Sequence, residues 1–120
     1  MDSVMISTFR NLRQQAINNQ YREIYSHELA HKHAAGSLAG SIVIEKNAQG
    51  LPVGGHVSIQ MPKLNPDNPD ETIEHANTVI KAALAPNDPS EQDYKVAGQA
   101  KAIKSKAENL KAKKRLDYYA

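Results

Sequence analysis

The sequence of 120 residues has no cysteine, no tryptophan and few aromatic residues, namely five Tyr and one Phe. Without cysteine there can be no disulfide and no thiolate metal site, so any metal would need His and carboxylate ligands. No stretch approaches the roughly 18 consecutive apolar residues of a membrane span. The N-terminus lacks the basic and then apolar pattern of a signal peptide. We therefore expect a cytoplasmic protein without a membrane span.

Length, composition and charge predict a single domain over residues 1–120, with residues 1–5 frayed and residues 117–120 forming a tail. The chain is 40% hydrophobic and 23% charged, which is ordinary globular composition. Because aromatic residues are few, we expect a modest core of Ala, Ile, Leu and Val. The formal net charge of +2 is too small to indicate the nature of a partner.

Periodicity and turn residues predict an α+β fold with a long N-terminal helix, a β-hairpin and two further helices. The expected elements are a helix over 9–35, strands over 41–45 and 51–60, and helices over 71–84 and 91–116. Ser7 or Thr8 is the expected cap of the first helix, and Asp70 is the expected cap of the second. The sequence from Ser90 to Asp93 resembles a capping box that opens the last helix, with Asp where Glu or Gln is usual.

The paired glycines Gly54 and Gly55 in the returning strand indicate a bulge or a close approach of the backbone to a neighbour. Two uses of the hairpin remain open. It could add an extended peptide by strand pairing, or it could only cover the first helix.

The last helix has a narrow apolar seam, which we expect to pack against the first helix. Its members repeat at spacings of four and three residues: Val96, Ala100, Ile103, Ala107 and Leu110. The same helix ends in a Lys-rich run. Since this run lacks interleaved aromatics and any recognition motif, it predicts a solvated face and no nucleic-acid partner.

The chain is organised around the motif HExxH, formed by His27, Glu28 and His31. On a helix, residues four apart lie on the same face, so two imidazoles can reach one metal ion. Glu28 is rotated by about 100° from His27, where it can take a proton from a metal-activated water. Ile17 and Ile24 lie on the same side as the histidines, which favours a partly dry pocket.

The segment from Arg22 to His31, followed by Ala34-Ala35-Gly36, resembles the signature of the SprA-related family. Further similar motifs follow in the same order: Val53 to Ile59, Ala82 to Pro86 and Asp88 to Asp93. The resemblance covers roughly residues 20–100. It implies a bacterial zinc-dependent peptidase that acts on peptides or proteins through a minimal zincin-like fold.

A catalytic zinc usually has three protein ligands and one water, so the motif requires a third ligand. We expect His56, on the returning strand, to provide it; the family usually has Glu there, and both residue types bind zinc. His75, with Glu71 four residues before it, is the next candidate. His33 and Glu45 are weaker candidates. The longer metzincin pattern is absent, because Ala34 and Ser37 stand where it needs Gly and His.

The resulting functional hypothesis is peptide-bond hydrolysis with Zn²⁺ as cofactor and Glu28 as general base. Tyr25, Tyr94 and His75 are candidate donors to the oxyanion, and Glu23 is a candidate to orient His27. Two readings without catalysis remain: a metal-stabilised binding or regulatory module, and a metal-free helical interaction domain. Almost nothing precedes the HExxH helix, where known zincins have a sheet. Either the hairpin after the helix takes the place of that sheet, or part of the machinery lies in a homodimer partner.

Overall fold

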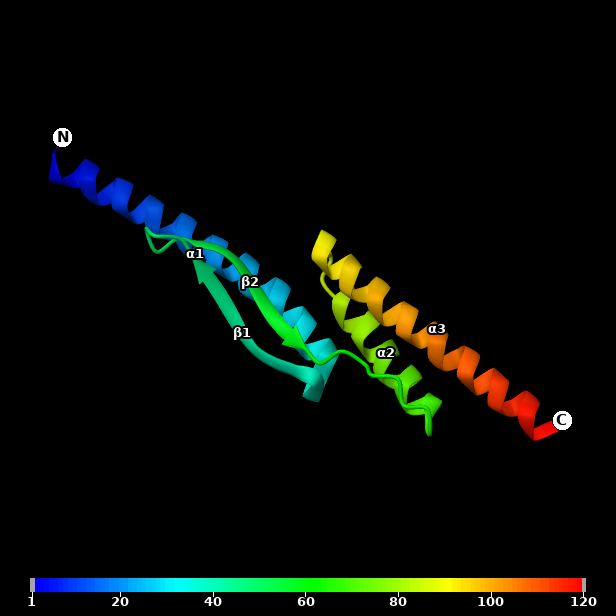
Figure 1. Ribbon diagram of the computed structural model, residues 1–120. Helices are drawn as coiled ribbons and strands as arrows, with labels where there is room; N and C mark the ends of the chain where they lie inside the picture. The colour runs from blue at the N-terminus through cyan, green and yellow to red at the C-terminus, as the bar shows by residue number, and fades with distance from the viewer. Residues whose placement is uncertain (1, 120) are drawn as a thin grey trace.

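The computed structural model describes residues 2–119, which form a long, narrow molecule of helices and one hairpin (Figure 1). Its elements are helix α1 (Ser3–Ala35), the short 3-10 turn η1 (Gly36–Leu38), strands β1 (Ala39–Lys46) and β2 (Pro52–Ile59), and helices α2 (Pro69–Ala83) and α3 (Glu91–Tyr119). This order confirms the predicted α+β arrangement of a long helix, a hairpin and two helices.

Helix α1 begins earlier than predicted because Asp2, and not Ser7 or Thr8, is its cap. The Oδ1 atom of Asp2 accepts a hydrogen bond from the backbone N–H of Met5 at 2.9 Å, which satisfies one of the free N–H groups of the first turn. The segment predicted to be frayed is therefore helical from Ser3 onward, while residue 1 lies outside the described residues. At the other end, Gly36 has a φ of 59°, a conformation that favours glycine.

The hairpin is a two-stranded antiparallel sheet in which Val43 pairs with His56 and Ile44 pairs with Gly55. Its turn is held by Asn47, whose Oδ1 accepts hydrogen bonds from the backbone N–H groups of Gln49 and Leu51, each at 3.0 Å. Both strands contact α1, so the sheet lies along the half of that helix that carries the HExxH motif (Figure 1).

Gly55 allows β2 to approach α1 closely. A Cβ atom built at Gly55 would lie 2.7 Å from Cγ2 of Ile24, 3.1 Å from Cγ of Glu28 and 3.1 Å from the carbonyl oxygen of Val43. Any side chain there would collide with these atoms, so glycine is required for this packing. The close approach predicted for the glycine pair is confirmed at Gly55.

Helix α2 begins after Asn68, whose side chain accepts a hydrogen bond from the backbone N–H of Glu71 at 3.3 Å. The predicted cap, Asp70, instead lies in the first turn and pairs with Lys111 of α3 at 2.7 Å. Helix α3 runs to Tyr119, through most of the predicted tail over 117–120, and residue 120 lies outside the described residues.

The core lies mainly between α2 and α3 and is built from small side chains. Its fully buried apolar residues on these helices are Ala76, Val79, Ala82, Ala83, Ala97, Ala100 and Ala107. The small side chains of the alanines let the two helices pack closely. The expectation that the α3 seam packs on the first helix is wrong, because α3 lies along α2.

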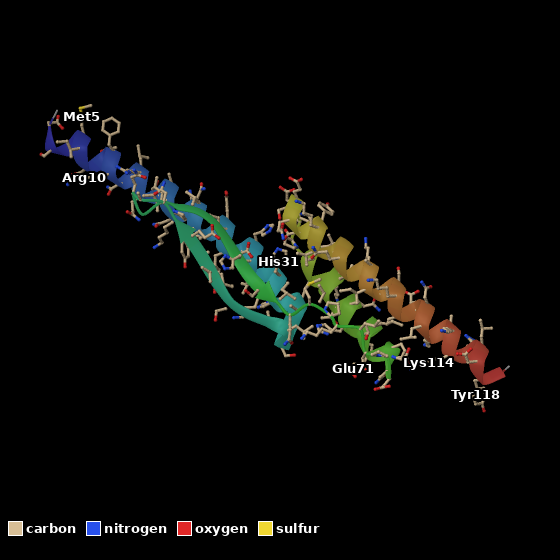
Figure 2. All side chains as sticks on the ribbon, in the orientation of Figure 1. Met5, Arg10, His31, Glu71, Lys114 and Tyr118 are labelled. Carbon is tan, nitrogen blue, oxygen red and sulfur yellow. The ribbon has the colours of Figure 1, made fainter. Side chains whose placement is uncertain are left out.

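The molecule measures 87 × 21 × 21 Å. The N-terminal half of α1, marked by Met5 and Arg10, projects at one end, and the last turns of α3, which reach Tyr118, project at the other (Figure 2). Several apolar residues of the α1 projection are exposed: Val4, Met5, Ile6, Phe9 and Leu12. No helix within residues 2–119 combines the length and apolar character needed to cross a membrane.

Candidate metal centre

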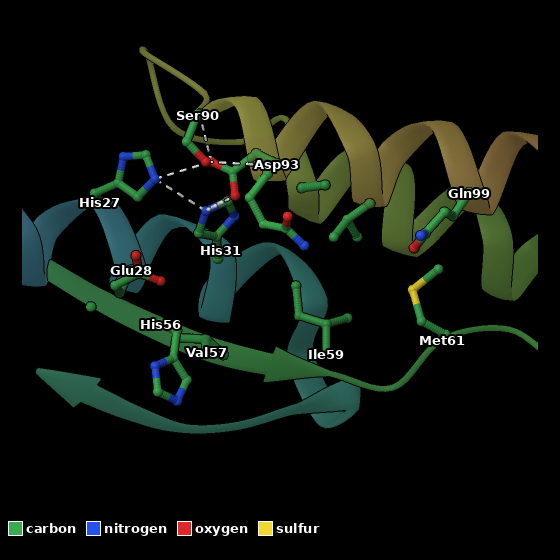
Figure 3. Close-up of a pocket in the computed structure, with 14 residues that line it drawn as sticks. His27, Glu28, His31, His56, Val57, Ile59, Met61, Ser90, Asp93 and Gln99 are labelled. Carbon is green, nitrogen blue, oxygen red and sulfur yellow. Dashed lines mark hydrogen bonds and ion pairs between the residues drawn. The ribbon is translucent and has the colours of Figure 1, made fainter. Parts of the chain in front are cut away.

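The HExxH motif lies where α1 meets β2 and the beginning of α3 (Figure 3). Glu28 and His31 are buried, with 6% and 5% of their surface exposed, and His27 is half-buried. One potential ligand atom from each of the three residues lies within 4.8 Å of the others. The Nε2 atoms of His27 and His31 are only 3.2 Å apart. The predicted alignment of the two imidazoles is therefore present.

Asp93, near the start of α3, provides a third group at this point. Its Oδ2 lies 3.1 Å from Nε2 of His27, and its Oδ1 lies 3.1 Å from Nε2 of His31. Figure 3 shows the carboxylate directed at both rings. One carboxylate thus faces two imidazoles that come from a helix more than sixty residues earlier in the chain.

The capping box predicted at the start of α3 holds Asp93 in place. The backbone N–H of Ser90 donates to Oδ2 of Asp93 at 2.8 Å, and the backbone N–H of Asp93 donates to Oγ of Ser90 at 3.1 Å. These reciprocal bonds fix the carboxylate before anything binds to it.

His31 is oriented from its other ring nitrogen. Its Nδ1 lies 2.7 Å from the carbonyl oxygen of Ala82, in the last turn of α2. A carbonyl oxygen only accepts, so Nδ1 carries the proton and donates it. In the neutral ring, Nε2 then bears the lone pair that faces His27 and Asp93, which is the arrangement typical of a metal-binding histidine.

Burial raises the pKa of Glu28 above its usual value, although His31 and His27 act in the opposite direction. Burial also acts to raise the pKa of Asp93, but the hydrogen bond from the Ser90 backbone, the neighbouring His31, the Ser90 side chain and His27 together lower it. The two carboxylates therefore differ in character. Asp93 favours the charged form that a cation needs, and Glu28 holds a proton more readily.

The donor set suits a divalent metal. Two imidazole nitrogens and one carboxylate form a common zinc ligand set. For metal–ligand bonds of about 2.0–2.1 Å in a tetrahedron, neighbouring ligand atoms are about 3.4 Å apart. The Nε2 atoms of His27 and His31 are 3.2 Å apart, close to that value, and each lies 3.1 Å from a different oxygen of the Asp93 carboxylate.

His56, predicted as the third ligand, lines the same cavity as His27 and His31. Among the described residues, however, the side chains close enough together to share one metal ion are those of His27, Glu28 and His31. Gly55 faces α1, and strand side chains alternate in direction, so the ring of its neighbour His56 points away from His27 and His31 (Figure 3). There its Nδ1 lies 3.0 Å from Oε1 of Glu45, and both side chains are more than half exposed. Asp93 occupies the place expected of His56.

The other candidates also lie elsewhere. Nε2 of His75 lies 2.8 Å from the carbonyl oxygen of Gln60, and His33 is exposed on the outside of α1. Tyr25 stacks on Tyr21 with 6.1 Å between ring centroids. Tyr94 is 59% exposed. Among the described residues, none of these four side chains lines the cavity beside the metal centre.

Sequence reasoning missed Asp93 as a candidate ligand, although two signals pointed to it. It stands in a capping box at the position where Glu or Gln is usual. It also ends the motif Asp88 to Asp93, which was one of the segments that resemble the family. Glu23, the residue expected to orient His27, lines a second hollow together with His27, Glu28 and Asp88.

A cavity of about 390 Å³ opens from the metal centre between β2 and α3. His27, Glu28 and His31 line one end of it, and Met61 and Gln99 line the other (Figure 3). Such a volume is in the range of small-molecule and peptide sites.

Comparison with known proteins identifies the family of this chain. The profile of the SprA-related family matches residues 8–118. Neither a curated protein nor a solved structure matches the chain. The matched region contains every residue of the metal centre and both walls of the cavity.

Proposed function

This chain belongs to the SprA-related family, and on that premise we propose that it is a zinc-dependent peptidase with a minimal zincin-like fold. The observation that carries the proposal is the convergence of two imidazole nitrogens and the Asp93 carboxylate beside the buried Glu28. The adjoining cavity gives a substrate access to this point, as a catalytic rather than a structural metal requires.

In this proposal His27, His31 and Asp93 hold the zinc, and Asp93 replaces His56 as the third ligand. Two of these ligands are held by residues that do not bind the metal. The carbonyl of Ala82 holds His31, and Ser90 holds Asp93. Such partners keep ligands oriented. When bound, zinc polarises the scissile carbonyl and acidifies water at the site.

Glu28 is the proposed general base. Its carboxylate lies within 4.8 Å of the histidine nitrogens, which leaves room for one water molecule between them. Burial raises its pKa, so it can take the proton of the attacking water and then pass it to the leaving amine. Glu28 faces the cavity and is not a member of the His27–His31–Asp93 set.

The test of this function is Glu28→Gln in zinc-loaded protein, with cleavage of unfolded casein and of a mixed peptide library as the readout. We expect cleavage to fall by about 100-fold or more, while the zinc content stays unchanged. Glu74→Gln, at an exposed position on α2 away from this cavity, is the matched control and should retain activity.

Two results would contradict the peptidase proposal. Zinc binding without any cleavage by the wild type would favour the metal-stabilised binding or regulatory module. Absence of zinc after incubation with excess metal would favour the helical interaction domain without metal.

A further inference from the structure

The cavity continues from the metal centre as a groove with two regular walls (Figure 3). One wall is β2 and the residues that follow it, where Val57, Ile59 and Met61 are spaced two apart, as on one face of an extended chain, and His56 lines the cavity beside them. The other wall is α3, which contributes side chains at helical spacing. The residues of the two walls are Val57, Ile59 and Met61, and Gln92, Val96 and Gln99.

The end of the groove away from the metal centre is apolar and uncharged. Ile59, Met61 and Val96 are each half-buried, so their apolar surfaces are only partly covered by the protein itself. A matching apolar side chain placed among them would remove that surface from water, which favours binding. A charged side chain at the same place would lose water without gaining a partner.

The main chain of β2 offers a second kind of contact. Within the described residues β2 pairs only with β1, so its other edge has no strand partner. That edge borders the groove, on the side of α3 (Figure 3). Unpaired backbone groups at a strand edge are a template for adding another extended chain.

From these observations we propose that the groove binds an extended peptide along the free edge of β2 and selects an uncharged apolar side chain of leucine or methionine size. Ile59, Met61 and Val96 form the subsite for that side chain. The part of this inference that concerns cleavage next to the selected residue rests on the proposed peptidase function, whereas peptide binding does not depend on it.

The test uses zinc-loaded Glu28→Gln protein with labelled methyl groups, observed by NMR. The probes are acetyl-Ala-Ala-Leu-Ala-Ala-amide and the same peptide with Asp in place of Leu. We expect the Leu peptide to bind at least about tenfold more tightly and to shift the methyl signals of Ile59, Met61 and Val96. The methyl signals of Val4 and Leu116, at the two ends of the molecule, should not move.

A substitution that introduces a positive charge into the groove strengthens the test. Met61→Lys places a cation in the groove on an unbranched side chain of similar length, and it should reverse the preference toward the Asp peptide. Leu116→Lys, at an exposed position far along α3, is the matched control and should leave the preference unchanged. Equal binding of both peptides, or methyl shifts outside the groove, would overturn the inference.

Cleavage by the wild-type protein separates this inference from the proposed function. Selective binding of the Leu peptide without cleavage would support the groove and contradict the peptidase. Equal cleavage of both peptides would support the peptidase and overturn the selectivity of the groove.

Discussion

Asp93 caps α3 and contacts the two histidines with the same carboxylate. Oδ2 accepts the cap bond from Ser90 and lies beside His27, while Oδ1 lies beside His31. The cap is a local contact within one helix, and the contacts with the histidines are long-range. The start of α3 therefore cannot shift without moving this candidate ligand.

Gly55 also serves both the fold and the candidate site, in this case because it has no side chain. Because it has no Cβ, β2 can lie against Ile24 and Glu28 and bring the strand edge beside the metal centre. Gly55→Ala should lower the free energy of unfolding by about 1–3 kcal/mol through overpacking, as measured by chemical denaturation.

Gly54→Ala is the matched control for that substitution. The nearest atom to its new Cβ would be Oε2 of Glu45 at 3.6 Å, an ordinary contact, so stability should change little. An unfolding midpoint for Gly55→Ala equal to that of the wild type would contradict the close approach.

The sequence allowed the first half of the site to be predicted, because a local spacing on a helix determines which side chains share a face. His27, Glu28 and His31 follow from that spacing alone. The third group depends on which distant segment meets the helix, and periodicity does not contain that information. The sequence also held an argument for looking beyond His56: if Gly55 approaches the helix, strand alternation turns the side chain of its neighbour His56 away from the helix.

Among the elements, α1 consists of two parts in different surroundings. Residues 3–16 are exposed throughout, whereas residues 24–35 pack against the hairpin and α2. The order and type of the elements followed from their hydrophobic patterns. The boundaries of the helices did not follow from these patterns, because Asp2 and Asn68 cap their helices from positions before the periodic pattern begins.

The exposed part of α1 should exchange its amide hydrogens quickly. Isolated helices of about 12–15 residues are marginal in water, and no neighbouring element within the described residues covers this one. Hydrogen exchange measured by mass spectrometry at low micromolar concentration should show residues 3–16 exchanging much faster than residues 24–35. Equal protection of both parts would contradict this division of α1.

At the scale of the whole molecule, the chain is much longer than a compact domain of its size. The Cα radius of gyration is 21.3 Å, whereas a compact domain of 120 residues has about 14 Å. The reason is that α1 and α3 overlap over only part of their lengths, with α2 between them (Figure 1). The core is small, so the long helices extend beyond it.

Small-angle X-ray scattering of dilute protein tests this shape. We expect a radius of gyration near 21.3 Å that does not depend on concentration for a monomer. A value near 14 Å would contradict the extended arrangement. A value that rises with concentration would indicate the homodimer considered from the sequence, with the exposed apolar residues of α1 as the first surface to alter.

The most direct test of the central claim is the zinc content per chain of untagged protein in three forms: wild type, Asp93→Asn and His56→Ala. We expect about one zinc in the wild type and in His56→Ala, because the His56 ring faces away from the site. Asp93→Asn should lose zinc or bind it at least about 100-fold more weakly, since even an outer partner of a ligand contributes 10–100-fold. Full zinc in Asp93→Asn together with loss in His56→Ala would contradict the account.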